Sequence, residues 1–73
     1  MSRNSTSVTL GRKLRTKRLE LGLKQVELSA KTDIDRSYIS RIETGKSSIR
    51  INTLTKLLKA LNLHLKFIQQ GEK

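Results

Sequence analysis

Apolar residues recur at helical spacing over most of this chain, and the clearest example is the segment 25–45, QVELSAKTDIDRSYISRIETG. Its apolar positions are Val26, Leu28, Ala30, Ile34, Ile39 and Ile42. The first three give an inward side to one short helix, and the last two lie three residues apart on one face of a second helix. The pattern therefore predicts helices over 25–31 and 36–44, joined by a tight turn that Ile34 fills.

The second of these helices carries polar side chains on its outward side. Asp35 is a favourable N-cap, because its carboxylate can accept hydrogen bonds from the free amides of the first turn. The outward residues are Arg36, Ser37, Ser40 and Arg41. A helix-turn-helix inserts its second helix N-terminus first into the major groove, where such side chains reach base edges. These four residues are therefore the candidates for reading DNA bases.

Two further helices are predicted on either side of this pair. The first is expected over about 10–21, after an N-cap at Thr9, and Gly22 ends it. The last follows an N-cap near Asn52. Their inward residues are Leu10, Leu14 and Leu21 in the first helix and Leu54, Leu57, Leu58 and Leu61 in the last. Together the helices make one domain over 9–62, after a flexible basic tail over 1–8.

The chain changes its apolar period after Asn62, a residue that can adopt a left-handed C-cap. The run LHLKFI alternates apolar Leu63, Leu65 and Phe67 with polar residues, which predicts a strand over 63–69 before a flexible end at 70–73. One strand cannot satisfy its own backbone groups, so we expect it to pair with the same strand of a second copy and form a homodimer. The alternative is a helix that continues through Phe67.

The residues from Leu10 to Leu63, and the motif IDRSYISRIETGK above all, resemble the XRE or lambda-repressor-like helix-turn-helix family. The resemblance implies an all-α bundle of four or five helices, to which the predicted C-terminal strand is added. The sequence departs from the family pattern at Lys24, where a capping Ser or Thr is common, at Ser29, which replaces an Ala, and at Asp33, which replaces a turn Gly.

Arg18 falls on the apolar stripe of the first predicted helix. A lone charge on a core face needs a partner, because an unpaired buried charge is expensive. The family resemblance implies that this partner is Glu43, near the end of the recognition helix. Arg18 and Glu43 are therefore expected to form a structural ion pair and not to contact DNA.

The charge balance points to an anionic partner. Sixteen Lys and Arg against six Asp and Glu leave a net charge of +10, with a pI near 10.8. Candidates for contacting DNA phosphates are Lys17, Lys24, Gln25, Tyr38, Thr44 and Lys46. At any one of the lysines, solubility explains the residue equally well, and Tyr38 could instead merely pad the helix. A membrane surface is the weaker alternative partner, because the two aromatic residues do not lie on an amphipathic basic helix.

Composition excludes several other classes. The chain has no cysteine and one histidine, so we expect no metal and no cofactor. It has no Gly-rich phosphate loop and no acid–base pair at a meaningful spacing, so we expect no enzyme. The start MSRNSTS has no apolar segment typical of a signal peptide, and no run is long enough to span a membrane, which favours a cytoplasmic protein.

These features predict a sequence-specific repressor that binds a palindromic double-stranded operator as a dimer. The run IRINTLTKLLKALNLHLKF resembles, more narrowly, the HipB-type antitoxins, which implies an autoregulated toxin–antitoxin operon and a HipA-type serine/threonine kinase toxin as protein partner. The alternative is a restriction-modification controller or a phage-type repressor. RNA or single-strand binding would fit the charge, but the chain lacks aromatic stacking platforms.

Overall fold

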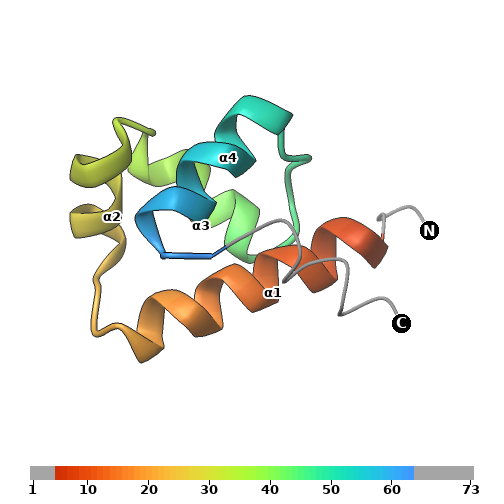
Figure 1. Ribbon diagram of the computed structural model, residues 1–73. Coiled ribbons are helices and arrows are strands. Elements are labelled where there is room, and N and C mark those ends of the chain that lie inside the picture. Colours follow the sequence, from red (N-terminus) through yellow and green to blue (C-terminus); the bar gives the residue numbers. More distant parts are fainter. Residues whose placement is uncertain (1–4, 64–73) are drawn as a thin grey trace.

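The computed structural model describes residues 5–63, which form four helices. They are α1 (Ser5–Glu20), α2 (Gln25–Thr32), α3 (Arg36–Glu43) and α4 (Ile51–Ala60). Figure 1 shows α1 along one side of the molecule and the three shorter helices stacked on it. The expected all-α helix-turn-helix architecture is confirmed for this part of the chain. None of its helices combines the length and the apolar character that a membrane span requires.

The core takes side chains from every helix and from two of the turns. Its buried members are Leu14, Leu28, Ile34, Ile39, Ile42, Leu57, Leu58 and Leu61. Burying a side chain of this size stabilises a fold by about 1.5–3 kcal/mol relative to leaving it in water. Each helix contributes too few of these side chains to be stable alone, so the four helices depend on one another for their stability.

Each helix is followed by a residue with a left-handed backbone, and Gly22 and Asn62 were expected in this role. Gly22 (φ +72°), Gly45 (φ +76°) and Asn62 (φ +59°) follow α1, α3 and α4, and Asp33 (φ +61°) follows α2. After the first three, the next amide donates back to a carbonyl of the last turn, in the bonds Leu23 N to Arg18 O (3.1 Å), Lys46 N to Arg41 O (2.8 Å) and Leu63 N to Leu58 O (2.7 Å). These bonds satisfy carbonyls that would otherwise lack a partner.

Several helix starts differ from the prediction. Helix α1 begins at Ser5, so the N-cap expected at Thr9 is wrong, and residues 5–8 belong to the helix and not to a tail. Helix α4 begins at Ile51 after an N-cap at Arg50, not after Asn52. A polar residue with capping ability signals a start only when the residues before it cannot continue the helix.

The inward face predicted for α2 was also wrong. Val26 is 57% exposed, and Ala30 is exposed as well, whereas Leu28 and Thr32 are buried. Residues two apart point in nearly opposite directions on a helix, while residues four apart share a face. Leu21 is 43% exposed because α1 ends at Glu20, one residue earlier.

The predicted strand over 63–69 lies outside the described residues except for Leu63. Leu63 is not in a strand; its amide closes the end of α4, and its side chain packs against the core. Leu65 and Phe67, the other expected dimer residues, lie outside the described part of the chain.

Helices α1 and α3 lie close together at Gly11. A Cβ atom built on Gly11 would lie 2.0 Å from the backbone oxygen of Ile42, far inside the contact distance of two atoms. Only a residue without a side chain fits there, and this close crossing sets the position of α3 over α1.

Candidate nucleic-acid interface

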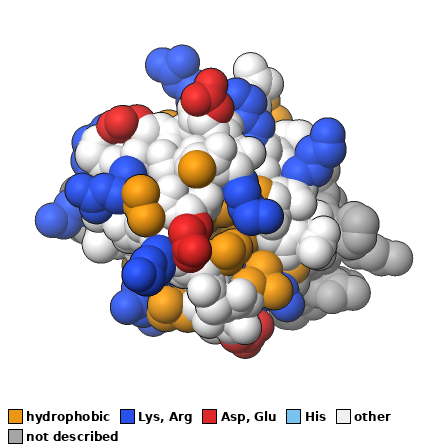
Figure 2. Space-filling model, turned by 90° about the vertical axis from the view of Figure 1, so that its left-hand side faces the viewer, with side chains coloured by type: hydrophobic (Ala, Val, Ile, Leu, Met, Phe, Trp, Pro, Cys, Tyr) orange, Lys and Arg blue, Asp and Glu red, His pale blue; other side chains and the backbone are white. Residues whose placement is uncertain are grey.

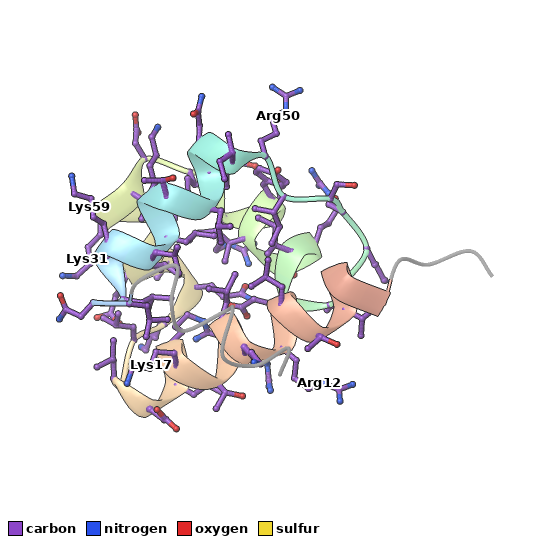
Figure 3. The ribbon with its side chains drawn as sticks, turned by 45° about the vertical axis from the view of Figure 1, so that its right-hand side comes forward. Arg12, Lys17, Lys31, Arg50 and Lys59 are labelled. Carbon is purple, nitrogen blue, oxygen red and sulfur yellow. The ribbon has the colours of Figure 1, made fainter. Side chains whose placement is uncertain are left out.

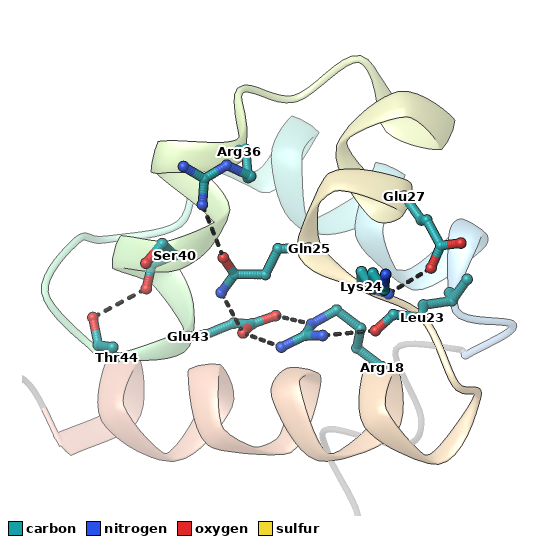
Figure 4. A network of polar contacts seen from close by, with 9 residues as sticks. All are labelled: Arg18, Leu23, Lys24, Gln25, Glu27, Arg36, Ser40, Glu43 and Thr44. Atoms are coloured by element: carbon teal, nitrogen blue, oxygen red, sulfur yellow. Dashed lines mark hydrogen bonds and ion pairs between the residues drawn. The ribbon is translucent and has the colours of Figure 1, made fainter.

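Helix α3 separates its core residues from its polar residues. Ile39, Ile42 and Glu43 are buried. The four residues expected to read bases lie on the other side, with Arg36, Ser37 and Arg41 exposed and Ser40 half-buried. The structure therefore brings all four to one solvent-facing side of α3 (Figure 4 shows Arg36 and Ser40 there).

The side chains of Ser29 and Thr32 hold the turn before α3, a role that the sequence did not predict for them. The Ser29 hydroxyl donates to the carbonyl of Ile34. The buried Thr32 hydroxyl donates to the carbonyl of Leu28 at 2.8 Å and accepts from the Ile34 amide at 3.3 Å. Ser29 is one of the departures from the family pattern, and here it adds a bond that an Ala could not make. These bonds fix the angle between α2 and α3.

Asp35 takes the N-cap position of α3, but its carboxylate does not cap the helix amides. It accepts a hydrogen bond from the hydroxyl of Ser37 instead. The expectation that the Asp35 carboxylate accepts hydrogen bonds from the first-turn amides was therefore wrong. The expected start of the helix at Arg36 is confirmed. The Asp35 side chain therefore leaves the first-turn amides of α3 without a cap.

Arg18 and Glu43 form a buried two-bond ion pair. Arg18 Nε donates to Glu43 Oε2 at 2.7 Å, and Arg18 Nη2 donates to Glu43 Oε1 at 2.9 Å. The third guanidinium nitrogen, Nη1, donates to the carbonyl of Leu23 at 2.7 Å. The side chains are only 7% and 3% exposed. Each buried charge is paired and hydrogen-bonded, so the pair ties α1 to the last turn of α3.

Gln25, the first residue of α2, connects this ion pair to the exposed side of α3. Its Nε2 donates to Glu43 Oε1 at 3.0 Å, and its Oε1 accepts from Arg36 Nη1 at 3.5 Å. Figure 4 shows the continuous path from Leu23 through Arg18, Glu43 and Gln25 to Arg36. Gln25 was expected to contact phosphate. Its bridging role was missed, because sequence spacing does not show which residues of different helices meet.

Arg41 and Tyr38 contact each other on α3. The guanidinium carbon of Arg41 lies 5.7 Å from the centroid of the Tyr38 ring, and Arg41 Nε donates to the Ser47 hydroxyl at 3.2 Å. The half-buried Tyr38 packs against the core and donates its hydroxyl to the Ser48 carbonyl at 3.1 Å. Tyr38 thus supports the loop after α3, and it positions Arg41 through a cation–π contact.

Three of the other expected phosphate contacts lie at the edges of the α2–α3 unit. Lys24 is exposed directly before α2, where its amide donates to Glu27 Oε1 at 2.7 Å. Thr44, exposed after α3, donates its hydroxyl to the Ser40 carbonyl at 3.1 Å, and Lys46 is exposed two residues later. Their positions suit contacts on both sides of a groove.

Lys17 is not part of this group. Its Nζ lies 3.6 Å from Glu20 Oε1, one turn further along α1. Lys17 also lines a hollow whose other described lining residues all belong to α1. The structure does not bring it to the exposed side of α3.

The surface is basic beyond α3. Lys and Arg side chains project around the edge of the face in Figure 2, with acidic side chains among them. Residues 5–63 contain no group of His, Cys, Asp and Glu that could hold a metal ion. The side chains of this region are mainly cationic groups that can donate hydrogen bonds.

Comparisons with known proteins agree with this geometry. The model of the helix-turn-helix family matches residues 14–68. The chain is similar to the control protein C.MunI of a Mycoplasma species, with 35% identity over 63 residues that cover 85% of each chain. It is also similar to the ImmF control region 10 kDa protein of Bacillus phage phi105, with 33% identity over 63 residues, 86% of this chain and 70% of that protein.

Solved structures give the same picture. The restriction-modification controller protein C.AhdI from Aeromonas hydrophila superimposes with a TM-score of 0.83 at 29% identity, over 89% of this chain and 98% of that one. The controller protein C.Esp1396I, solved as a tetramer with its natural 35 base-pair operator, gives a TM-score of 0.83 at 26% identity, over 93% and 90% of the two chains.

The chain therefore belongs to the helix-turn-helix family, and within it to the XRE type. None of the relatives described here is an antitoxin. They agree better with the alternative expectation, a restriction-modification controller or a phage-type regulator, than with a HipB-type antitoxin.

Proposed function

We propose that this protein is a sequence-specific regulator of transcription that binds double-stranded DNA by placing α3 in the major groove. The observation that carries the proposal is the arrangement of α3, whose buried side is fixed by the core and by Glu43, and whose exposed side holds Arg36, Ser37 and Arg41. A rigid helix that presents donors on one side is suited to reading base edges.

The proposed base-reading residues are Arg36, Ser37, Ser40 and Arg41. The two arginines can each place a planar fork against guanine O6 and N7, whereas the serines are short and accept several partners. Two arrangements support the arginines in this role. Gln25 holds Arg36 from α2, and the Tyr38 ring and the Ser47 hydroxyl hold Arg41.

The proposed phosphate contacts are Lys24, Thr44 and Lys46, together with the backbone amides at the start of α2 and α3. Helix N-termini bind anions well because their first amides are free and the helix dipole is positive there. Lysines beside these ends add attraction that does not depend on sequence. Such contacts would set the register of the helices on the duplex.

We propose that this regulator is of the restriction-modification controller type. This proposal is supported by the similarity to C.MunI and C.AhdI over most of the length of each. An antitoxin with a HipA-type kinase partner is the weaker candidate, because it rests on the resemblance of the C-terminal segment alone. We also propose that the protein acts as a homodimer on a palindromic operator, with its two α3 helices about one turn of DNA, roughly 34 Å, apart.

The test is a selection of bound duplexes from a randomised DNA library, followed by titration of a fluorescent selected duplex. We expect a two-fold symmetric consensus, and binding at least a thousandfold tighter than to a scrambled duplex of equal length. Single-stranded DNA and RNA hairpins serve as competitors. Equal affinity for all duplexes, or tighter binding to single strands, would contradict the proposal.

A further inference from the structure

An open hollow lies between α4 and the C-terminal end of α2, and the proposed DNA contacts do not use it. Its lining residues are Lys31, Thr32, Lys56, Lys59, Ala60 and Asn62, and its volume is about 550 Å³. We name it the lysine hollow. Figure 3 shows two of its residues, Lys31 and Lys59, together at one edge of the molecule, with Arg12 at another.

The three lysines of this hollow are exposed, and no ion pair within residues 5–63 involves them. The ion pairs within residues 5–63 join Lys17 to Glu20 and Arg18 to Glu43, and neither involves the hollow. A lysine in the last turn of a helix stabilises the helix dipole, which accounts for Lys31 in α2 and Lys59 in α4. It does not account for Lys56, which lies near the middle of α4. Three like charges around one depression repel one another and favour an anionic ligand.

The hollow and the exposed side of α3 face different directions. Helix α3 turns Ile39 and Ile42 toward the shared core, and α4 turns Leu57, Leu58 and Leu61 toward the same core. Their exposed sides therefore point away from it on separate faces, and Figure 1 shows α4 in front of α3. A duplex held by α3 would leave the lysine hollow open to a second ligand.

The chemistry of the hollow also differs from that of α3. The cations of α3 are both arginines, whose planar forks suit phosphates and guanine. The cations of the hollow are all lysines, compact charges on flexible stems that can each follow a separate carboxylate. The exposed carboxamide of Asn62 adds a hydrogen-bond donor, and half-buried Ala60 gives an apolar patch between the charges.

We propose that the lysine hollow binds an acidic segment of a protein partner, a short run of Asp and Glu side chains. Charge complementarity supplies the attraction, and the separation from α3 lets the contact form on the DNA-bound protein. This inference does not depend on which operator the protein reads, because it rests on the surface of α2 and α4 alone.

The test follows the amide signals of the isotopically labelled full chain by NMR while a ten-residue glutamate peptide is added. We expect the largest shifts at residues 31–32 and 56–62, and smaller ones over 36–41. The double variant Lys31→Gln/Lys59→Gln should weaken peptide binding at least tenfold. The control Arg12→Gln/Arg15→Gln removes the same charge from exposed positions of α1 and should change it less than twofold.

Three results would overturn the proposal. Equal weakening in both double variants would mean that net charge alone attracts the peptide. Shifts centred on α3 would place the acidic ligand on the DNA face. Stronger shifts of the hollow amides with a random 16 base-pair duplex than with the peptide would assign the hollow to nucleic acid. If Lys31→Gln/Lys59→Gln does not fold, the single variant Lys56→Gln is used, with an expected loss of about threefold.

Discussion

Gln25 donates to the same carboxylate oxygen of Glu43 that Arg18 Nη2 uses, at 3.0 Å and 2.9 Å respectively. This shared acceptor fixes the orientation of the Gln25 amide, with its nitrogen toward Glu43 and its oxygen toward Arg36 at 3.5 Å. A buried structural pair and an exposed side chain proposed to read DNA are thereby connected through one residue. A change at Gln25 can therefore test how Arg36 is held in place without removing the charge of Arg36.

The Gln25→Glu variant should lose stability, because it replaces the donor beside Glu43 with a second carboxylate. A lost hydrogen bond to a charged group costs about 1.5–3 kcal/mol, and repulsion between the two carboxylates adds to it. Urea unfolding followed by circular dichroism measures the change. Val26→Ala, at the exposed neighbouring position, is the control and should be nearly neutral. Equal stability of Gln25→Glu and the native chain would show that the Gln25–Glu43 contact is not formed in solution.

Removal of one member of the buried ion pair should be severe. Arg18→Ala leaves Glu43 buried without its counter-charge, a loss on the order of 3–5 kcal/mol. The double variant Arg18→Ala/Glu43→Ala removes both charges and should lose less than the sum of the single changes Arg18→Ala and Glu43→Ala. Thermal melts of the four proteins form the cycle. Lys17→Ala breaks the exposed Lys17–Glu20 pair and should cost under about 1 kcal/mol. Additive effects of the two core changes would mean that the pair contributes no coupling.

Arg36 should carry base specificity. On a duplex obtained by selection, Arg36→Ala should weaken binding by about 1–3 kcal/mol and affect a scrambled duplex much less. Lys46→Ala should weaken both duplexes alike and flatten the salt dependence, since a phosphate contact carries no sequence information. Fluorescence anisotropy at several salt concentrations separates the two patterns. If Arg36→Ala weakens both duplexes equally, Arg36 contacts only phosphate.

Gly11→Ala should separate α1 from α3. The added methyl group would lie 2.0 Å from the Ile42 oxygen, so one helix must shift, and overpacking of this kind typically costs about 1–3 kcal/mol. Gly22→Ala is the matched comparison, because its new Cβ meets nothing within 4 Å and it tests only the left-handed backbone (φ +72°). That conformation costs an alanine about 1–2 kcal/mol. The two variants should differ in DNA affinity as well, since only Gly11→Ala displaces α3. An unchanged melting temperature for Gly11→Ala would contradict the close helix crossing.

The dimer prediction concerns residues outside the described part of the chain. If the part of the predicted 63–69 strand that follows Leu63 pairs with its equivalent in a second copy, Leu65→Lys should yield monomers, because the charge would lie on the face expected to pack against the helices. Sedimentation velocity measures this directly, with Lys66→Gln as the control. A truncated protein ending at Leu63 that still dimerises and binds a selected duplex would assign dimerisation to the helices.

The sequence by itself determined the local features of this fold. Gly22, Gly45 and Asn62 mark helix ends because the left-handed backbone they adopt is a property of the single residue and its neighbours. The spacing of Ile39 and Ile42 determined which side of α3 is buried, and so which side is left for Arg36 and Arg41. The net charge of +10 indicated an anionic partner without any coordinates.

Only the tertiary structure decided which residues of different helices meet. Glu43 lies 25 residues after Arg18 and 18 residues after Gln25, so no periodic pattern could show that Gln25 and Arg18 share one carboxylate. Packing also decided that Thr32 is buried and that Gly11 touches α3. A periodic pattern reports on neighbours within about one helical turn, whereas these contacts depend on how whole helices cross, which the combined core of all four helices determines.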